Sequence, residues 1–78
     1  MFIENKYYKL YTQIIKNRQI FEYQGYTEKH HIIPRSCGGT NLKSNLVSVS
    51  AREHYLLHRL LVKCTKGQQH YKMAHALF

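Results

Sequence analysis

The sequence predicts an α+β fold in which a two-stranded hairpin is followed by a capped helix. Apolar and polar residues alternate along NLVSVS, residues 45–50, as expected for a half-buried strand. The run YTEKHHII, residues 26–33, predicts an earlier strand that ends at Pro34. Ser50 and Glu53 then form a capping box, which places the start of a helix at Ala51.

An N-terminal helix is expected over residues 1–22. Its apolar side chains recur at helical spacing and define one packing face, formed by Ile3, Tyr7, Leu10 and Ile14. The tyrosines of this segment, Tyr8 and Tyr11 among them, could stack on bases, but tyrosine on a small helix more often belongs to the core or its rim. We therefore expect this helix to pack in the core with a solvated basic side, and contacts of that side with phosphates stay open.

The second helix is expected to run from Ala51 to about Lys63. It carries an apolar arc formed by Leu57, Leu60 and Leu61. A break at residues 65–67 precedes a last helical segment, residues 68–78, whose packing face would be Tyr71, Ala74 and Phe78. The chain ends in the apolar, uncapped run AHALF, which suggests a longer parent protein. One domain over residues 1–78 is expected.

Charge and composition narrow the class of protein. Lysine and arginine number 12 against 4 acidic residues, a formal charge of +8 that favours a polyanionic partner over a merely soluble basic protein. The 2 cysteines form no CxxC pair, which excludes a cysteine zinc finger and indicates reduced thiols. No apolar run approaches the roughly 20 residues of a membrane span, and no secretory segment is present at the N-terminus. We expect a cytoplasmic protein with no membrane contact, in a cell or an infected host.

Four histidines form the candidate functional constellation. His54 and His58 are four positions apart on the second helix, so both imidazoles lie on one face. His30 and His31 are adjacent on the first strand and therefore point to opposite faces. Only one of that pair can face the helix, while the other points away from the ribbon. The pattern predicts a metal site of three histidines and a fourth histidine that stays free.

The order of these motifs resembles the HNH nucleases. Five short motifs follow one another over residues 26 to about 62: HHIIP, the GG of the loop, NLV, REH and the final HxxxH. The sequence of this stretch is similar to that of HNH endonucleases of phages, including homing-type enzymes. The resemblance implies a ββα-metal (His-Me finger) core over residues 26–63, beside the N-terminal helix and the C-terminal helical segment. The glycine pair of the loop could bind a phosphate, but we expect it to form an ordinary turn.

The resemblance also implies roles for individual residues. His31 would be the general base that activates water, and Asn45 would pin the loop and orient the His31 ring. One divalent metal ion would be held by three histidines, namely His30, His54 and His58. Many HNH proteins carry aspartate at the position of His30, so this site is richer in nitrogen. Three imidazoles suit zinc, nickel or manganese better than magnesium, although hydrolysis with magnesium stays open.

The expected activity is metal-dependent hydrolysis of DNA phosphodiester bonds, with nicking of one strand and no small-molecule cofactor. Basic side chains flank the motifs and are candidates for backbone contacts, with Arg35 first, followed by Lys29, Lys43, Arg52 and Arg59. Two alternatives stay open: a non-catalytic nucleic-acid-binding module with a structural metal, and a toxin-like nuclease acting on RNA. A free His31 favours catalysis, because a structural site has no use for it. Sequence preference would come from a further domain or a dimer.

Overall fold

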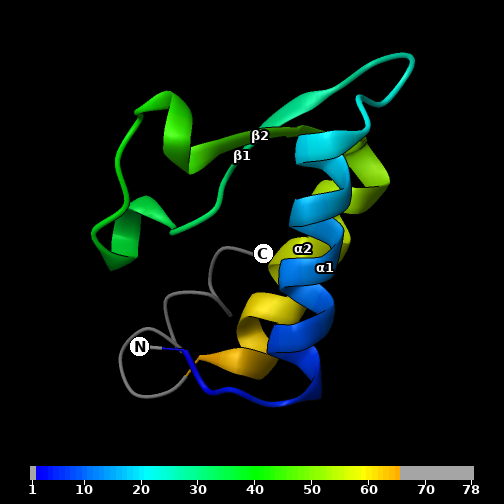
Figure 1. Cartoon of the computed structure of the whole chain (residues 1–78). Coiled ribbons are helices and arrows are strands. Elements are labelled where there is room, and N and C mark those ends of the chain that lie inside the picture. Colours follow the sequence, from blue (N-terminus) through cyan, green and yellow to red (C-terminus); the bar gives the residue numbers. More distant parts are fainter. Residues whose placement is uncertain (1, 66–78) are drawn as a thin grey trace.

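The computed structural model describes residues 2–65, which form two helices and a two-stranded antiparallel sheet (Figure 1). The elements follow one another as α1 (Lys6–Ile20), β1 (Glu28–His31), β2 (Leu46–Val49) and α2 (Ala51–Cys64), with 3-10 turns at Arg35–Cys37 and Lys43–Asn45 between the strands. The predicted α+β class and the order strand, loop, strand, helix are confirmed. The predicted C-terminal helical segment, with His70 and His75, lies outside the described residues.

The two helices run side by side in opposite directions, and the hairpin lies across one end of them (Figure 1). The strands pair from Glu28 opposite Val49 to His31 opposite Leu46. Both strands are shorter than predicted, because regular pairing stops where the chain turns into the long loop after His31. The Ile32 amide still donates to the Asn45 carbonyl at 2.9 Å, so the loop leaves the sheet gradually.

Helix α1 begins later than predicted because Asn5 caps it. The Asn5 Oδ1 accepts hydrogen bonds of 3.0 Å from the amides of Tyr7 and Tyr8. The residues before the cap are extended instead, and Phe2 forms an isolated antiparallel bridge with Thr65. The N-terminal segment therefore joins the start of α1 to the far end of α2.

The packing face of α1 differs from the predicted one by one position. The buried side chains are Tyr11 and Ile15, at 2% and 5% exposure, whereas Leu10 is 47% exposed. Tyr7 and Ile14 are only half-buried, and Ile3 lies outside the helix. The hydroxyl of Tyr11 finds polar partners in the core, and the burial of this tyrosine as a core residue is confirmed. The predicted face is right for Tyr7 and Ile14, which pack against the core, and wrong for Leu10 and Ile3.

Helix α2 begins with the predicted capping box. The Glu53 amide donates to the Ser50 hydroxyl at 3.1 Å, and the Ser50 amide donates to the Glu53 carboxylate at 3.0 Å. The predicted apolar arc is also confirmed, since Leu57 and Leu61 are fully buried and Leu60 nearly so. The helix ends one residue beyond the expected Lys63, at the buried Cys64.

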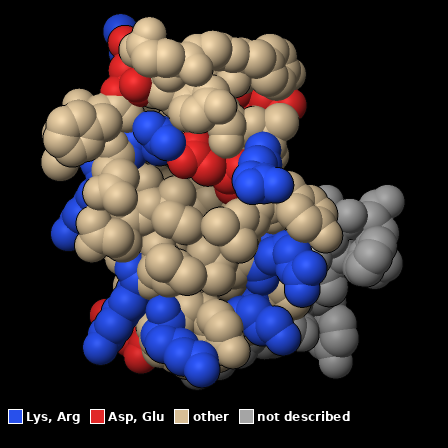
Figure 2. Space-filling view, turned by 90° about the vertical axis from the view of Figure 1, so that its right-hand side faces the viewer, with Lys and Arg blue, Asp and Glu red and all other residues tan. Residues whose placement is uncertain are grey.

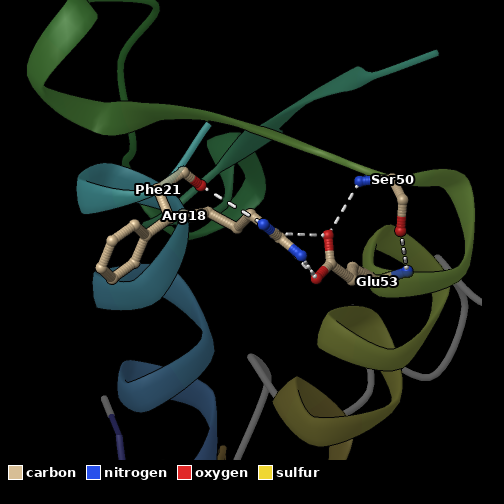
Figure 3. Close-up of polar contacts among 4 residues, drawn as sticks. All are labelled: Arg18, Phe21, Ser50 and Glu53. Atoms are coloured by element: carbon tan, nitrogen blue, oxygen red, sulfur yellow. Dashed lines mark hydrogen bonds and ion pairs between the residues drawn. The ribbon is translucent and has the colours of Figure 1, made fainter. Parts of the chain in front are cut away.

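Glu53 has a second structural partner in Arg18, near the end of α1 (Figure 3). The guanidinium contacts both carboxylate oxygens, at 2.7 Å from one terminal nitrogen and at 2.8 and 2.9 Å from Nε. The hydrogen bond from Arg18 is the main reason that the pKa of Glu53 lies below its ordinary value. The predicted structural role of Glu53 is thus confirmed, and the pair ties the end of α1 to the start of α2.

Candidate metal and catalytic site

Three of the four histidines of the constellation converge between the sheet and α2. One nitrogen from each of His30, His54 and His58 lies within 4.8 Å of the other two. Their ring centres are separated by 5.3 Å from His30 to His54 and by 5.0 Å from His54 to His58. His30 is only 1% exposed, and the two helical histidines are half-buried.

Secondary structure places these rings as the sequence pattern predicts. His54 and His58 stand one turn apart on the face of α2 that borders its buried leucines. His30 lies opposite Val47 in the sheet and points inward with it, so it is the member of the pair that faces the helix. The expectation that only one of the two adjacent histidines joins the helical pair is confirmed, but the expectation that His31 lies on the far side of the ribbon is wrong, because His31 lines a cleft with His54 and His58.

The cluster fits a divalent metal ion on its own chemistry. The Nδ1 atoms of His30 and His58 are buried without any hydrogen-bond partner among the described residues. Buried polar atoms are nearly always paired, so two such atoms in one cluster call for a ligand that accepts their lone pairs. Metal–nitrogen bonds of about 2.0–2.1 Å bring ligand nitrogens closer together than the 4.8 Å within which they now lie, so the rings would move inward on binding.

The environment keeps His30 and His58 uncharged in the absence of metal. Burial, and then the neighbouring His58 and His54, lower the pKa of His30 to about 3. Burial, and then His54, also lower the pKa of His58. Neutral imidazole is the form that binds metal, so these rings are ready for a cation at any pH near neutrality.

The lowered pKa of His30 predicts a loss of stability in acid for the metal-free protein. The unfolded chain has the ordinary pKa of 6.5 and the folded chain about 3, so the unfolded state binds more protons between these values. Stability is therefore full above pH 6.5 and falls as the pH drops below it, by about 1.4 kcal/mol per pH unit. Between pH 7 and pH 5 we expect a loss of about 2 kcal/mol from His30 in urea unfolding with EDTA.

This pH range lies above the titration of the carboxylates, whose lowered pKa values act only further into acid. The variant His31→Gln, which changes a histidine outside the cluster, should show nearly the same difference between pH 7 and pH 5. Equal stability of the unaltered chain at the two pH values would contradict the burial of a neutral His30.

His31 lies at the end of β1 and lines a cleft of about 420 Å³. The cleft is also lined by His54 and His58, together with Lys29 and Arg35. His31 was expected on the far side of the ribbon, away from the cluster. It lies closer to the cluster than that, because β1 ends at His31 and the chain turns there. The His31 imidazole, two cluster histidines and two cations share one cavity, and its described lining includes no carboxylate.

Asn45 fastens the loop that follows β1. Its Oδ1 accepts from the Ile33 amide at 2.8 Å, and its Nδ2 donates to the carbonyls of Ile33 and Thr40 at 3.0 and 2.8 Å. The His31 ring is not bonded to Asn45 but donates from Nε2 to the Oδ1 atom of another asparagine, Asn41, at 2.7 Å. Asn45 thus holds the loop, and Asn41 contacts the ring.

Gly39 is required where this loop folds back on itself. A Cβ atom there would lie 1.7 Å from the Ile33 carbonyl oxygen and 2.9 Å from Asn45 Nδ2. We expect Gly39→Ala to destabilise the protein by about 3 kcal/mol or more, the upper end of overpacking costs, in urea unfolding. Gly38→Ala is the matched control, because its site is open and only its φ of 93° is unfavourable, at about 1–2 kcal/mol. Equal effects of the two substitutions would rule out the close approach.

The predicted DNA-binding cations do not share one surface. Lys29 and Arg35 line the cleft of His31, whereas Arg52 and Arg59 line a separate groove of about 470 Å³ with Tyr7 and Tyr55. Lys43 is exposed in the loop. Figure 2 shows basic side chains spread around an uncharged area on the face it presents, with acidic ones mostly in its upper part. Charge alone therefore does not mark a path for a ligand, and the cleft is the better guide.

Three residues near the site were missed by sequence reasoning. The Glu28 carboxylate lies 2.8 Å from His54 Nδ1, and the alternation EKHH could have placed it on the same strand face as His30. The hydroxyl of Tyr11 lies 2.7 Å from His30 Nε2, a contact between distant parts of the chain with no local signal. Asn41 follows the glycine turn, and its contact with His31 depends on how the loop closes.

Fold and site together define a small α+β protein with a candidate three-histidine metal centre beside a further histidine. In sequence, the chain is 47% identical over 58 residues to probable mobile endonuclease E of Enterobacteria phage T4, covering 73% of this chain and 41% of that protein. It is 44% identical over 62 residues to probable mobile endonuclease D of the same phage, covering 73% of this chain and 24% of that protein.

A shorter stretch of 38 residues is 58% identical to probable mobile endonuclease B of the same phage. The expected resemblance to phage-encoded homing-type endonucleases is thereby confirmed, and the chain spans less than half the length of these relatives. No protein-family model and no solved structure matches the chain. Within residues 2–65, neither helix has the length and apolar character needed to cross a bilayer.

Proposed function

We propose that this chain is the metal-binding part of a DNA endonuclease of the HNH type, which nicks one strand with His31 as general base. In this proposal residues 26–63 are the ββα-metal core and α1 is an added support. The observation that carries it is the shared cleft, where His31 meets two histidines of a cluster suited to a metal. The names of the phage relatives support a nuclease role for the segment that they share with this chain.

The proposed chemistry assigns a separate task to each group. The metal, held by His30, His54 and His58, would neutralise charge on the phosphate and assist the leaving 3′ oxygen. His31 takes a proton from the attacking water, which an imidazole can do near neutral pH. Because the Asn41 amide oxygen accepts from Nε2–H of His31, the Nδ1 atom is the one free to receive that proton. Asn45 keeps the loop, and with it the cleft, in place.

The two basic residues of the cleft, Lys29 and Arg35, are expected to hold the DNA backbone. Replacing Lys29 and Arg35 together by glutamine should weaken nicking and reduce the salt dependence of DNA binding, by a slope of about 0.9 for each lost phosphate contact. The matched control replaces Arg52 and Arg59 by glutamine, which removes the same charge from the other groove. We expect its nicking rate to change less. A larger effect of the control pair would place the scissile strand on that groove.

The proposal is tested by incubating supercoiled plasmid with the purified chain and magnesium, manganese, zinc or nickel in turn, with EDTA as the control. Nicked circles that appear with at least one metal and are abolished by EDTA are the expected result. DNA that shifts on a gel but is never cut would indicate a binding module with a structural metal. Cleavage of RNA but not DNA in parallel reactions would move the substrate class to RNA.

A further inference from the structure

The hydroxyl of Tyr11 lies between the backbone and one of the cluster histidines. It donates to the Ile32 carbonyl oxygen at 2.7 Å, since a carbonyl oxygen can only accept. The hydroxyl has a single hydrogen, so in its second contact, 2.7 Å from His30 Nε2, it must be the acceptor. The proton of the neutral His30 ring therefore resides on Nε2.

This tautomer leaves the other ring nitrogen of His30 bare. Nδ1 is buried and has no hydrogen-bond partner among residues 2–65, and its ring stands beside those of His54 and His58, at 5.3 and 5.4 Å between centres. A proton on this atom would place a buried N–H in the cluster and block it as a ligand. The Tyr11 contact prevents that arrangement by making Nε2 the donor.

His54 is held in the opposite way. Its Nδ1 lies 2.8 Å from Glu28 Oε1, and a carboxylate oxygen accepts, so in the neutral ring Nδ1 carries the proton and Nε2 is bare. Glu28 is itself steadied by the Tyr26 hydroxyl, which donates to its other oxygen at 2.9 Å. The two histidines thus present different nitrogens, Nδ1 from the strand and Nε2 from the helix.

We propose that Tyr11 and Glu28 are positioning residues that preset opposite tautomers of His30 and His54 for a divalent cation. The inference rests on the metal site of the proposed function. It makes α1, which lies outside the ββα core, a supporting part of the metal centre through one buried hydroxyl. Outer partners of metal-binding histidines fix the tautomer and ring orientation in this manner, and their loss weakens binding.

The test compares Tyr11→Phe with the unaltered chain in two measurements. Titration calorimetry with zinc should show about 10- to 100-fold weaker binding by the variant. Long-range proton–nitrogen NMR of the metal-free protein should show His30 protonated on Nε2 in the unaltered chain and a mixture of tautomers in the variant. Tyr8→Phe removes a hydroxyl from the same helix without a contact to histidine, and it should match the unaltered chain in both.

The outcomes separate this inference from the proposed function. If the unaltered chain binds no zinc, the proposed metal site fails, whatever the tautomer of His30. If it binds zinc and Tyr11→Phe binds equally well with an unchanged tautomer, the inference is overturned. Should Tyr11→Phe not fold, Glu28→Ala, which alters a half-buried side chain, provides the measurement. Zinc binding by Glu28→Ala as tight as by the unaltered chain would then overturn the inference.

Discussion

Replacing His31 by alanine is expected to lower plasmid nicking by about 100- to 10,000-fold, the range that removal of a general base or acid costs. The ring lines the cleft and is oriented by Asn41, but it is not one of the clustered histidines. Zinc affinity should therefore stay unchanged while the chemical step slows. Single-turnover nicking rates with saturating metal, beside zinc titrations, measure the two effects separately.

The variant Asn41→Ala provides the graded comparison for His31. It keeps the imidazole and removes the hydrogen bond that orients it, so its nicking rate should fall less than that of His31→Ala. Nicking by His31→Ala at the rate of the unaltered chain would assign the base to another group. A fall in zinc affinity in the same variant would place His31 among the metal ligands instead.

Replacing His58 by alanine is expected to abolish metal-dependent nicking, because it removes one of the three proposed ligands. His58 Nδ1 has no hydrogen-bond partner in residues 2–65, so the substitution takes away a ligand atom and little other polar support. We expect zinc binding to weaken by more than the 10- to 100-fold typical of losing an outer partner. Calorimetry measures this loss of zinc affinity directly. The metal-induced rise in melting temperature measures it as well, because a ligand present at 100 times its Kd stabilises the folded protein by about 2.7 kcal/mol.

His31→Ala is the matched control for that experiment, as it changes a histidine in the same cleft outside the cluster. The two variants should behave in opposite ways, one losing metal and the other losing only rate. Zinc binding by His58→Ala equal to that of the unaltered chain would exclude the three-histidine centre.

Local signals were enough to predict much of this fold. The capping box located the start of α2 at Ala51, and strand alternation predicted that His30 and His31 would point apart. HxxxH spacing placed His54 and His58 on one helix face. These predictions depend on residues within a few positions of each other, where backbone geometry alone sets which side chains are neighbours.

Contacts between distant segments could not be predicted in the same way. The phase of α1 is set by the partners that Tyr11 finds in the sheet, and apolar spacing alone pointed to Leu10 instead. The distribution of Arg35 and Arg59 over separate grooves depends on how α2 rests on the hairpin and α1. The error at Leu10 arises because periodicity gives a helix face only approximately, while tertiary packing selects the buried residue.

Helix α1 is attached to α2 at both of its ends. Near its start, the Ile3 amide donates to the Cys64 carbonyl at 2.7 Å and Asn5 Nδ2 donates to the Lys63 carbonyl at 3.0 Å, while Arg18 holds Glu53 at the other end. One added residue turns a helix by about 100° and lengthens it by about 1.5 Å. An insertion between the two attachments would therefore move the Tyr11 hydroxyl away from His30 or break one attachment. The number of residues in α1 between the two attachments is thus tied to the contact between Tyr11 and His30, and through it to the proposed metal site.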